Sequence, residues 1–279
     1  MTVQIVTDST ADLPPQIAED MGITVVPLTV HFGTETLRDG VDIKPDEFYK
    51  RLELASTLPT TSQPTVGDFL NSYQELGSSG EGIVSIHISG KLSGTLNSAN
   101  QAKEQYKGTS QIITVDSEIG SIALGLVTIA AQKAATEGYD TNQVAEIAKE
   151  TSARTRFFAL LDTLEYLEKG GRIGKAQAFV GSLLRVKPIL TAKDGAVHPL
   201  ERARSRTKGI DRLLELVNEN APHARIGVVY STTPDDAQAL ADRLKPLSPN
   251  EDIIVSQIGP VVGTHLGPGV IGVAFTTSS

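Results

Sequence analysis

The sequence predicts a two-domain α/β protein, with an N-terminal three-layer α/β/α domain on a parallel sheet and a C-terminal α/β domain on a mixed sheet. Three observations carry this prediction. Strand and helix patterns alternate up to about residue 152, which is typical of parallel sheets covered by helices. Beyond that point candidate strands cluster, and Asp194-Gly195 between two of them signals an antiparallel hairpin. A chain of 279 residues with 39% hydrophobic content is long enough for two cores.

Several elements of the first half carry recognisable boundary signals. Pro45 opens a helix over 46–53, and Thr65 caps another, with Asp68 three residues on as an imperfect capping box. Segment 58–64 between these helices is interpreted as a loop. The remaining predicted strands are 3–6, 23–30, 83–88 and 112–115, and the remaining predicted helices are 14–21, 96–106, 122–136 and 142–152.

The second half is richer in strands. We place the domain boundary between residues 152 and 156, which gives domains of residues 1–153 and 154–279. No linker composition marks this junction, so we expect the two domains to pack closely. The predicted strands are 157–161, 187–191, 196–200, 225–230, 252–257 and 270–275, and the predicted helices are 174–184, 207–218 and 234–244.

Composition and charge exclude several classes of protein. The chain has no cysteine and does not begin with a basic and then apolar leader, so we expect a cytoplasmic location. The longest nearly apolar run, 119–131, is shorter than the ~20 residues that span a bilayer, so no stable membrane insertion is expected. A net charge of -8 disfavours nucleic acid as a partner, because phosphate backbones would be repelled.

Polar residues follow three of the predicted parallel strands. Thr7-Asp8-Ser9 follows the first strand, 87–89 the third and Asp116-Ser117 the fourth. In open α/β sheets the carboxyl ends of the strands form the ligand crevice. Each group alone could equally be a turn or a helix cap. Their shared position predicts a ligand site at this edge of the sheet.

Segment 89–97 joins a buried strand to a helix and contains Ser93-Gly94-Thr95. A glycine at position 94 lets a ligand approach the backbone, and the helix amides with the two hydroxyls offer donors to a carboxylate or phosphate. A simple serine cap on the helix explains the same residues. The spacing around Lys91 does not match a Walker A loop.

Two further polar segments lie elsewhere in the chain. Thr60-Thr61-Ser62 lies between prolines that stiffen the loop and keep its hydroxyls available. His265 lies in the glycine-rich segment 263–269, where a histidine is structural more often than functional. A G-x-G-x-x-G match begins at Gly267, but it leads into a strand and is rejected as a dinucleotide fingerprint.

A possible basic patch completes the set. Arg172 follows Gly170-Gly171, which could be only a helix C-cap, and with Arg202 and its basic neighbours it would suit a protein partner or a phosphate. No metalloprotease or serine-hydrolase motif occurs, and the five histidines lack metal spacing. We therefore expect no metal, no cofactor and no catalytic residue.

In this order, five segments resemble the DegV family, whose members bind fatty acids and include the fatty-acid-binding subunits of bacterial fatty acid kinase. The resemblance covers essentially the whole chain and implies a DegV-like fold. It implies that Thr61, Ser93 and His265 lie on the ligand carboxylate, with the Gly94 amide nearby. The segments are IVTDSTADL (5–13), TTSQP (60–64), SGT (93–95), LEYLEKGGRI (164–173) and GTHLGPG (263–269).

The resemblance also implies a division of labour between this chain and a partner. The chain would hold one long-chain fatty acid without catalysing a reaction, and a separate ATP-dependent fatty acid kinase catalytic subunit would make the acyl phosphate. Arg172 and Arg202 match positions thought to face that kinase. The acyl phosphate would then pass to bacterial phospholipid synthesis.

Other hypotheses remain open at this point. Ser93 as nucleophile and His265 as base would make a serine-dependent acyl hydrolase, with Asp8 or Asp116 as candidates to orient the histidine. A nucleotide- or phosphate-binding regulator would use the polar strand ends. An apolar slot for the acyl tail could lie between helices of the first domain, where the possible lining residues, equally good as ordinary core, are Phe69, Leu70, Ile122, Leu126 and Ile129.

Overall fold

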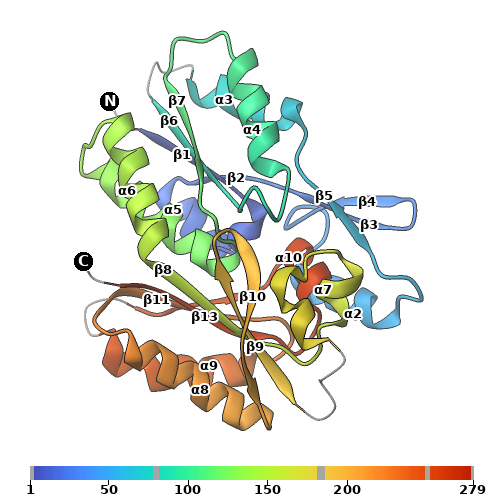
Figure 1. The fold of residues 1–279 in the computed structure, drawn as a ribbon. Helices are drawn as coiled ribbons and strands as arrows, with labels where there is room; N and C mark the ends of the chain where they lie inside the picture. Colours follow the sequence, from blue (N-terminus) through green and yellow to red (C-terminus); the bar gives the residue numbers. More distant parts are fainter. Residues whose placement is uncertain (1–2, 78–81, 181–185, 249–251, 278–279) are drawn as a thin grey trace.

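The computed structural model describes residues 3–77, 82–180, 186–248 and 252–277, and it confirms the predicted α/β class (Figure 1). Sheet A is wholly parallel, in the order β2-β1-β6-β7. Strand β6 is buried at every position, as expected of a parallel strand covered on both faces. The elements are β1 (Gln4–Asp8), β2 (Thr24–Val26), β6 (Ile83–His87), β7 (Ile112–Asp116), α1 (Pro15–Met21), α3 (Val66–Leu76), α4 (Thr95–Gln105), α5 (Ser121–Thr136) and α6 (Thr141–Arg154).

Sheet D is the mixed sheet predicted for the second domain. Its order is β10-β9-β8-β13-β11-β12, and only β11 and β12 pair in parallel. Helices α8 and α9 cover one face, where they share an apolar cluster with alternate residues of the strands. The elements are β8 (Thr155–Leu160), β9 (Lys187–Lys193), β10 (Ala196–Ala203), α8 (Arg206–Glu219), β11 (His223–Tyr230), α9 (Pro234–Leu244), β12 (Ile254–Gln257) and β13 (Ile271–Thr277).

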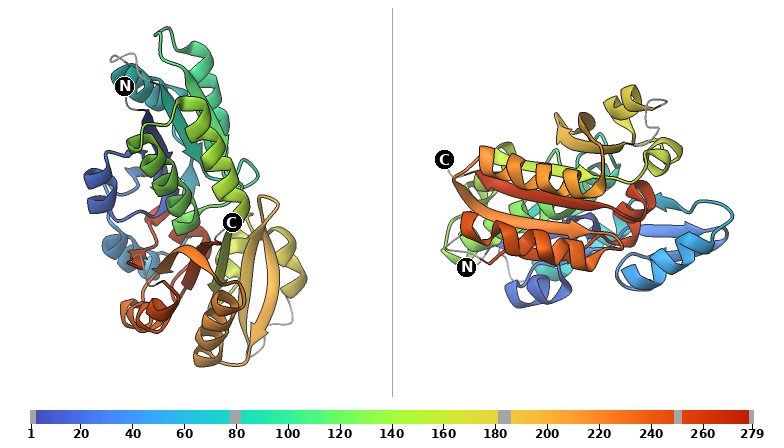
Figure 2. Two further views of the ribbon diagram at one scale, coloured as in Figure 1. Left: turned by 90° about the vertical axis from the view of Figure 1, so that its left-hand side faces the viewer. Right: turned by 90° about the horizontal axis from the view of Figure 1, so that it is seen from below.

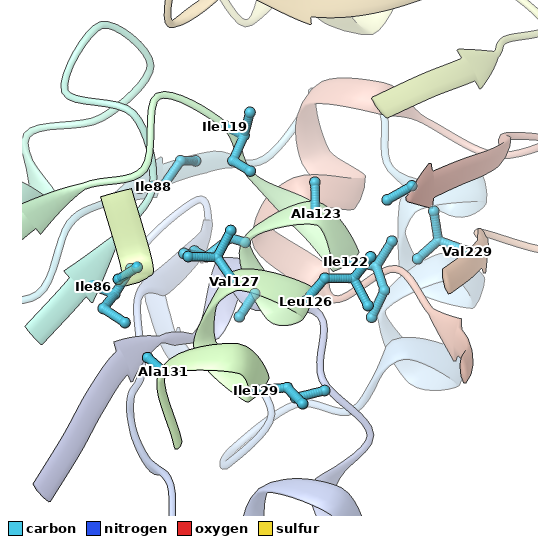
Figure 3. Packing of buried hydrophobic residues seen from close by; sticks show 14 of the residues in the cluster. Ile86, Ile88, Ile119, Ile122, Ala123, Leu126, Val127, Ile129, Ala131 and Val229 are labelled. Atoms are coloured by element: carbon cyan, nitrogen blue, oxygen red, sulfur yellow. The ribbon is translucent and has the colours of Figure 1, made fainter. Parts of the chain in front are cut away.

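Helix α5 packs between the two sheets. It contacts β1 of sheet A and also β8, β11 and β13 of sheet D. Ile122 and Leu126 lie on the side of α5 that faces Val229 of β11, and Val127 lies toward Ile86 of β6 (Figure 3). A helix that is apolar all round belongs in the interior of a protein. The two domains therefore share a core through α5. The boundary after residue 153 falls at the junction of α6 and β8, and it stays a prediction.

A third, antiparallel sheet was not predicted. It has the order β4-β3-β5 and projects with α2 from the side of the molecule (Figure 2). The predicted strand 23–30 is wrong as a single strand, because it divides between two sheets at Pro27, which lacks the N–H that a ladder needs. The predicted loop 58–64 contains β5. The elements are β3 (Thr29–Phe32), β4 (Glu35–Arg38), α2 (Pro45–Leu54) and β5 (Thr60–Ser62).

Two short helices near the domain junction also differ from the sequence prediction. α7 (Glu165–Lys169) and α10 (Pro260–Leu266) were not predicted, and α10 contacts α2, α7 and β3. The predicted helix 174–184 is a 3₁₀ helix over Gly174–Phe179, and residues 181–185 of that prediction lie outside the described residues. Two further 3₁₀ turns are Ser9–Ala11 and Lys245–Leu247.

Within the described ranges, no helix has the length and apolar character to cross a membrane.

Candidate ligand-binding site

A cavity lies between the two domains at the carboxyl edge of sheet A. Thr10, Leu28, Ile88 and Gly120 line it, and each follows one of the four parallel strands. Counting the part that opens to solvent, the space between its lining atoms is about 970 Å³. We call it the interdomain cavity. Its position agrees with the crevice expected from strand topology.

Most of the interdomain cavity wall is apolar. Strand β8 contributes Phe157 and Ala159, and Leu161 follows at the same two-residue interval, while Phe158 and Leu160 pack into the core beneath α8 and α9. This alternation is a signal that sequence reasoning could have used to place one face of the strand on a ligand. The other apolar lining residues are Leu92, Leu167, Leu190, Ala192, Val197, Val261, Val262 and Leu266.

Three of the polar side chains that line the cavity are Thr61, Ser93 and His265. Thr61 on β5 and His265 on α10 are 204 positions apart in the sequence, yet Thr61 Oγ1 lies 2.9 Å from His265 Nε2. Ser93 lines the same cavity from the loop before α4. Its hydroxyl lies 2.8 Å from Thr95 Oγ1 and accepts a bond from the Thr95 N–H, so Ser93 also serves as a helix-end partner. Three side chains that the sequence singled out thus line one cavity, and two of them are in contact.

The imidazole of His265 is held in its neutral form. Burial, and to a smaller extent the nearby positive charge of Arg172, together lower its pKa to about 4. Its Nδ1 is buried and has no hydrogen-bond partner among the described residues. A neutral imidazole has a single N–H donor, which can support a hydroxyl that binds an anion, and it brings no full charge into an apolar cavity.

The remaining predicted site residues lie at different distances from the cavity. Gly94 precedes the first residue of α4 and packs against the side chain of Gln63, which lines the cavity. Exposed Arg172 also lines the cavity, and its guanidinium donates to the carbonyls of Leu92 and Gly170. Exposed Arg202 does not line it. The Arg202 guanidinium stacks 4.2 Å above the ring centroid of Phe179.

Two buried carboxyl groups hold the start of α10, the helix that carries His265. Asp12 Oδ1 accepts the N–H of Gly259 at 2.8 Å, and its other oxygen accepts the hydroxyl of Ser121 at 2.5 Å. Asp39 Oδ2 accepts the N–H of Val261 at 3.4 Å. Burial raises the pKa of Asp12 to about 8 and that of Asp39 to about 7, because a carboxylate loses solvation there. The helix that carries His265 is therefore attached to two carboxyl groups, Asp12 and Asp39, whose protonation depends on pH near neutrality.

The polar strand-end residues Asp8, His87 and Asp116 do not line the interdomain cavity. Asp8 Oδ2 lies 3.0 Å from His87 Nδ1, and His87 Nε2 lies 2.6 Å from Ser85 Oγ. Tyr73 donates to the same serine. All four side chains of this chain of hydrogen bonds are buried. It resembles a catalytic triad in residue type, but Ser85 and His87 are fully buried and do not line the interdomain cavity, so it holds β1, β6 and α3 together.

The structure does not bring Ser93 and His265 into the contact that the hydrolase hypothesis requires. Among the described residues Ser93 and His265 share no hydrogen bond, since His265 pairs with Thr61 and Ser93 with Thr95. Asp8 is occupied by His87, and Asp116 accepts the backbone N–H groups of Gly90 and Glu118. In the same described ranges, no three histidine, cysteine or acidic side chains group as a metal site would require.

The suggested lining residues of the acyl slot lie elsewhere. Phe69 and Leu70 pack under α4, and Ile122, Leu126 and Ile129 belong to the core around α5. None of these five residues lines the interdomain cavity. The cavity lies at the junction of the domains, whereas the sequence analysis placed the slot for the acyl tail within the first domain.

Comparisons with known proteins agree over the whole chain. A family model described as an uncharacterised protein of the DegV family matches residues 2–278. A DegV domain-containing protein of Halalkalibacterium halodurans is 39% identical over 277 residues, covering 98% of both chains, and protein DegV of Bacillus subtilis is 35% identical over 279 residues, covering 99% of both.

Solved structures give the same result for the fold. A DegV family protein from Thermus thermophilus, described by its fatty acid binding, is 34% identical with a TM-score of 0.91 over all of both chains. The structure of DegV from Bacillus subtilis, described as a fatty acid binding protein, is 34% identical with a TM-score of 0.90, again over all of both chains.

Proposed function

This chain belongs to the DegV family, and from that premise we propose that it binds one long-chain fatty acid in the interdomain cavity. The carboxylate lies on Thr61, Ser93 and His265, with the Gly94 amide nearby. One observation carries the proposal: a mostly apolar cavity is also lined by the hydroxyls of Thr61 and Ser93 and by a neutral imidazole that contacts Thr61. That arrangement matches the two ends of a fatty acid. The fatty acid binding described for the Thermus thermophilus and Bacillus subtilis proteins supports it.

The tail supplies most of the affinity in this proposal. Each buried methylene contributes ~0.8 kcal/mol, so a chain of about 14 methylenes contributes on the order of 10 kcal/mol of transfer free energy. A hydrogen bond to the charged carboxylate adds ~1.5–3 kcal/mol, which is enough to fix the direction in which the ligand lies. The apolar wall therefore sets how tightly the acid binds, and the polar wall sets its orientation.

The carboxylate would also select one tautomer of His265. A carboxylate only accepts hydrogen bonds, so the Thr61 hydroxyl donates to it. The Thr61 oxygen then accepts the Nε2–H of His265 across the 2.9 Å contact. In this arrangement Nδ1 is the unprotonated nitrogen, in agreement with its lack of an acceptor among the described residues.

We further propose that the chain is a carrier and not an enzyme. A separate ATP-dependent fatty acid kinase converts the bound acid to an acyl phosphate, which this chain then delivers to phospholipid synthesis in a bacterial cytoplasm. Arg172 and Arg202 face that kinase. The exposure of both guanidinium groups on an otherwise acidic protein supports this role. The absence of cysteine fits a reducing compartment.

Ligand extraction tests the binding proposal directly. Solvent extraction and mass spectrometry of the purified protein should yield close to one fatty acid per chain, and the delipidated protein should bind oleate. Ser93→Ala should weaken oleate binding roughly two- to tenfold through one lost hydrogen bond. Ser72→Ala on α3, outside the cavity, is the matched control. An empty protein that also fails to bind oleate would refute the proposal.

The carrier role has its own test. Arg202→Ala should keep the oleate affinity of the wild type, because Arg202 does not line the cavity. It should reduce acyl phosphate formation by a fatty acid kinase. Unchanged acyl phosphate formation would contradict the partner-facing role. Rapid labelling of Ser93 by a fluorophosphonate, together with turnover of acyl esters, would instead support the hydrolase hypothesis.

A further inference from the structure

The loop that presents Ser93 is tied to the second domain. Ser89 Oγ donates to the carbonyl of Gly195 at 2.7 Å, and Lys91 Nζ donates to the carbonyl of Asp194 at 2.7 Å. Both acceptors belong to the turn that joins β9 to β10. Two adjacent carbonyls of one domain are therefore bound by two side chains of a single loop in the other.

This loop is tightly wound, so its two ends move together. The Ser89 carbonyl accepts the N–H groups of Leu92 at 2.9 Å and Ser93 at 3.1 Å. The Ser89 hydroxyl also accepts the N–H of Lys91 at 3.2 Å. A displacement of Ser89 is thus transmitted to Ser93 through one turn of backbone. Arg172 adds a third tie from the second domain, because its Nε donates to the Leu92 carbonyl at 3.2 Å.

The turn is shaped for this contact. Asp194 and Gly195 both have left-handed backbone angles, with φ of 50° and 74°, as a two-residue hairpin turn requires. A Cβ on Gly195 would lie 2.8 Å from Ser89 Oγ, so the close approach needs glycine. Ser89 is fully buried, and the bond to Gly195 satisfies its hydroxyl. The strands on either side of the turn supply Ala192 and Val197 to the cavity wall.

We propose that Ser89 and Lys91 are positioning residues for the head-group site, because they fix Ser93 against the wall that carries His265. The inference rests on the proposed fatty acid binding and deepens it. The first domain supplies Ser93 and Thr61, and the second domain supplies His265. The contact with the Asp194-Gly195 turn fixes the position of Ser93 relative to the second domain. Neither positioning residue touches the ligand, so each acts through Ser93.

The consequence is specific to the head group. Loosening the tie lets Ser93 move away from the carboxylate but leaves the apolar wall in place. The variants should therefore lose selectivity for a fatty acid over the fatty alcohol of the same chain, which shares the tail and lacks the carboxylate. A general loosening of the domain junction would instead weaken the acid and the alcohol by the same factor.

The experiment compares oleate with oleyl alcohol on the delipidated full chain. Lys91→Met removes the donor of an exposed side chain and should fold normally. It should lower oleate affinity roughly two- to tenfold, the effect of one hydrogen bond, and change oleyl alcohol affinity less than twofold. Lys91→Arg should restore the preference. Lys193→Met is the matched control, because this exposed lysine lies on the same hairpin and its side chain makes no hydrogen bond or ion pair among the described residues.

A double-mutant cycle then tests the route through Ser93. In a Ser93→Ala background, Lys91→Met should have no further effect on the preference for oleate. Equal loss of both ligands, or full additivity of the two substitutions, would overturn the positioning role while leaving fatty acid binding intact. A wild-type protein that binds neither ligand would refute the proposed function itself, so the two failures are distinguishable.

Discussion

Replacing Asp12 by asparagine should flatten the dependence of protein stability on pH. The raised pKa of Asp12, about 8 in the folded chain, means that the folded state keeps a proton that the unfolded state releases near the ordinary pKa of 3.8. Stability falls with rising pH wherever the folded state binds more protons. The loss begins above pH 3.8 and is complete once the pH passes about 8. Asparagine resembles the protonated acid and carries no such proton.

The magnitude follows from the number of protons involved. Between pH 5 and pH 7 Asp12 keeps close to one proton on folding, so the free energy of unfolding falls by about 3 kcal/mol over these two units. Asp39, with a pKa of about 7, adds a decrease of similar size over most of the same window. Asp12→Asn should therefore remove roughly half of the combined decrease of these two groups.

Urea unfolding of the delipidated chain at pH 5 and pH 7 measures this difference. Asp20→Asn is the matched control, because Asp20 is an exposed carboxylate on α1 that accepts a hydrogen bond from the Gln16 side chain. The control should keep the wild-type pH dependence. If Asp12→Asn lost as much stability between the two pH values as the wild type does, Asp12 would not be the source of the decrease, and the account of the α10 attachment would be wrong.

Two further predictions concern His265. Nitrogen NMR should find that His265 titrates near pH 4. Arg172→Gln should raise this pKa by removing a positive charge, and bound oleate should raise it by adding a negative one. A titration of His265 near pH 6.5 would contradict its burial. Gly170→Ala would place a Cβ 2.4 Å from His265 Nδ1 and should push the ring off Thr61, which lowers oleate affinity roughly tenfold with circular dichroism unchanged. Wild-type affinity in that variant would show that ring position is unimportant.

The parallel sheet was predictable because its signal is local. Strands β1, β6 and β7 are short apolar runs, and α3, which lies between β1 and β6 in the chain, begins at the cap Thr65. The third sheet was missed for the opposite reason. The strand over Thr60–Ser62 is three polar residues long and exists only because β3 lies beside it. No pattern within such a segment distinguishes it from a loop.

The site had a similar mixture of local and distant signals. The resemblance to a family singled out Thr61, Ser93 and His265, yet residue spacing could not predict that Thr61 and His265 lie 2.9 Å apart, because contacts of long sequence separation depend on the complete fold. His265 also lies on a helix that its glycine-rich surroundings concealed. The apolar lining of the cavity was missed because its residues come from both domains, whereas the predicted slot used residues of the first domain only.

The position of β13 has a consequence for how the chain is made. This strand is the last in the sequence, yet it lies in the interior of sheet D, between β8 and β11. A ribosome-bound chain that has not yet released residues 271–277 therefore leaves β8 and β11 without the partner between them. Unpaired strand edges of this kind attract other chains. The protection of these two strand edges from other chains therefore depends on the placement of residues 271–277.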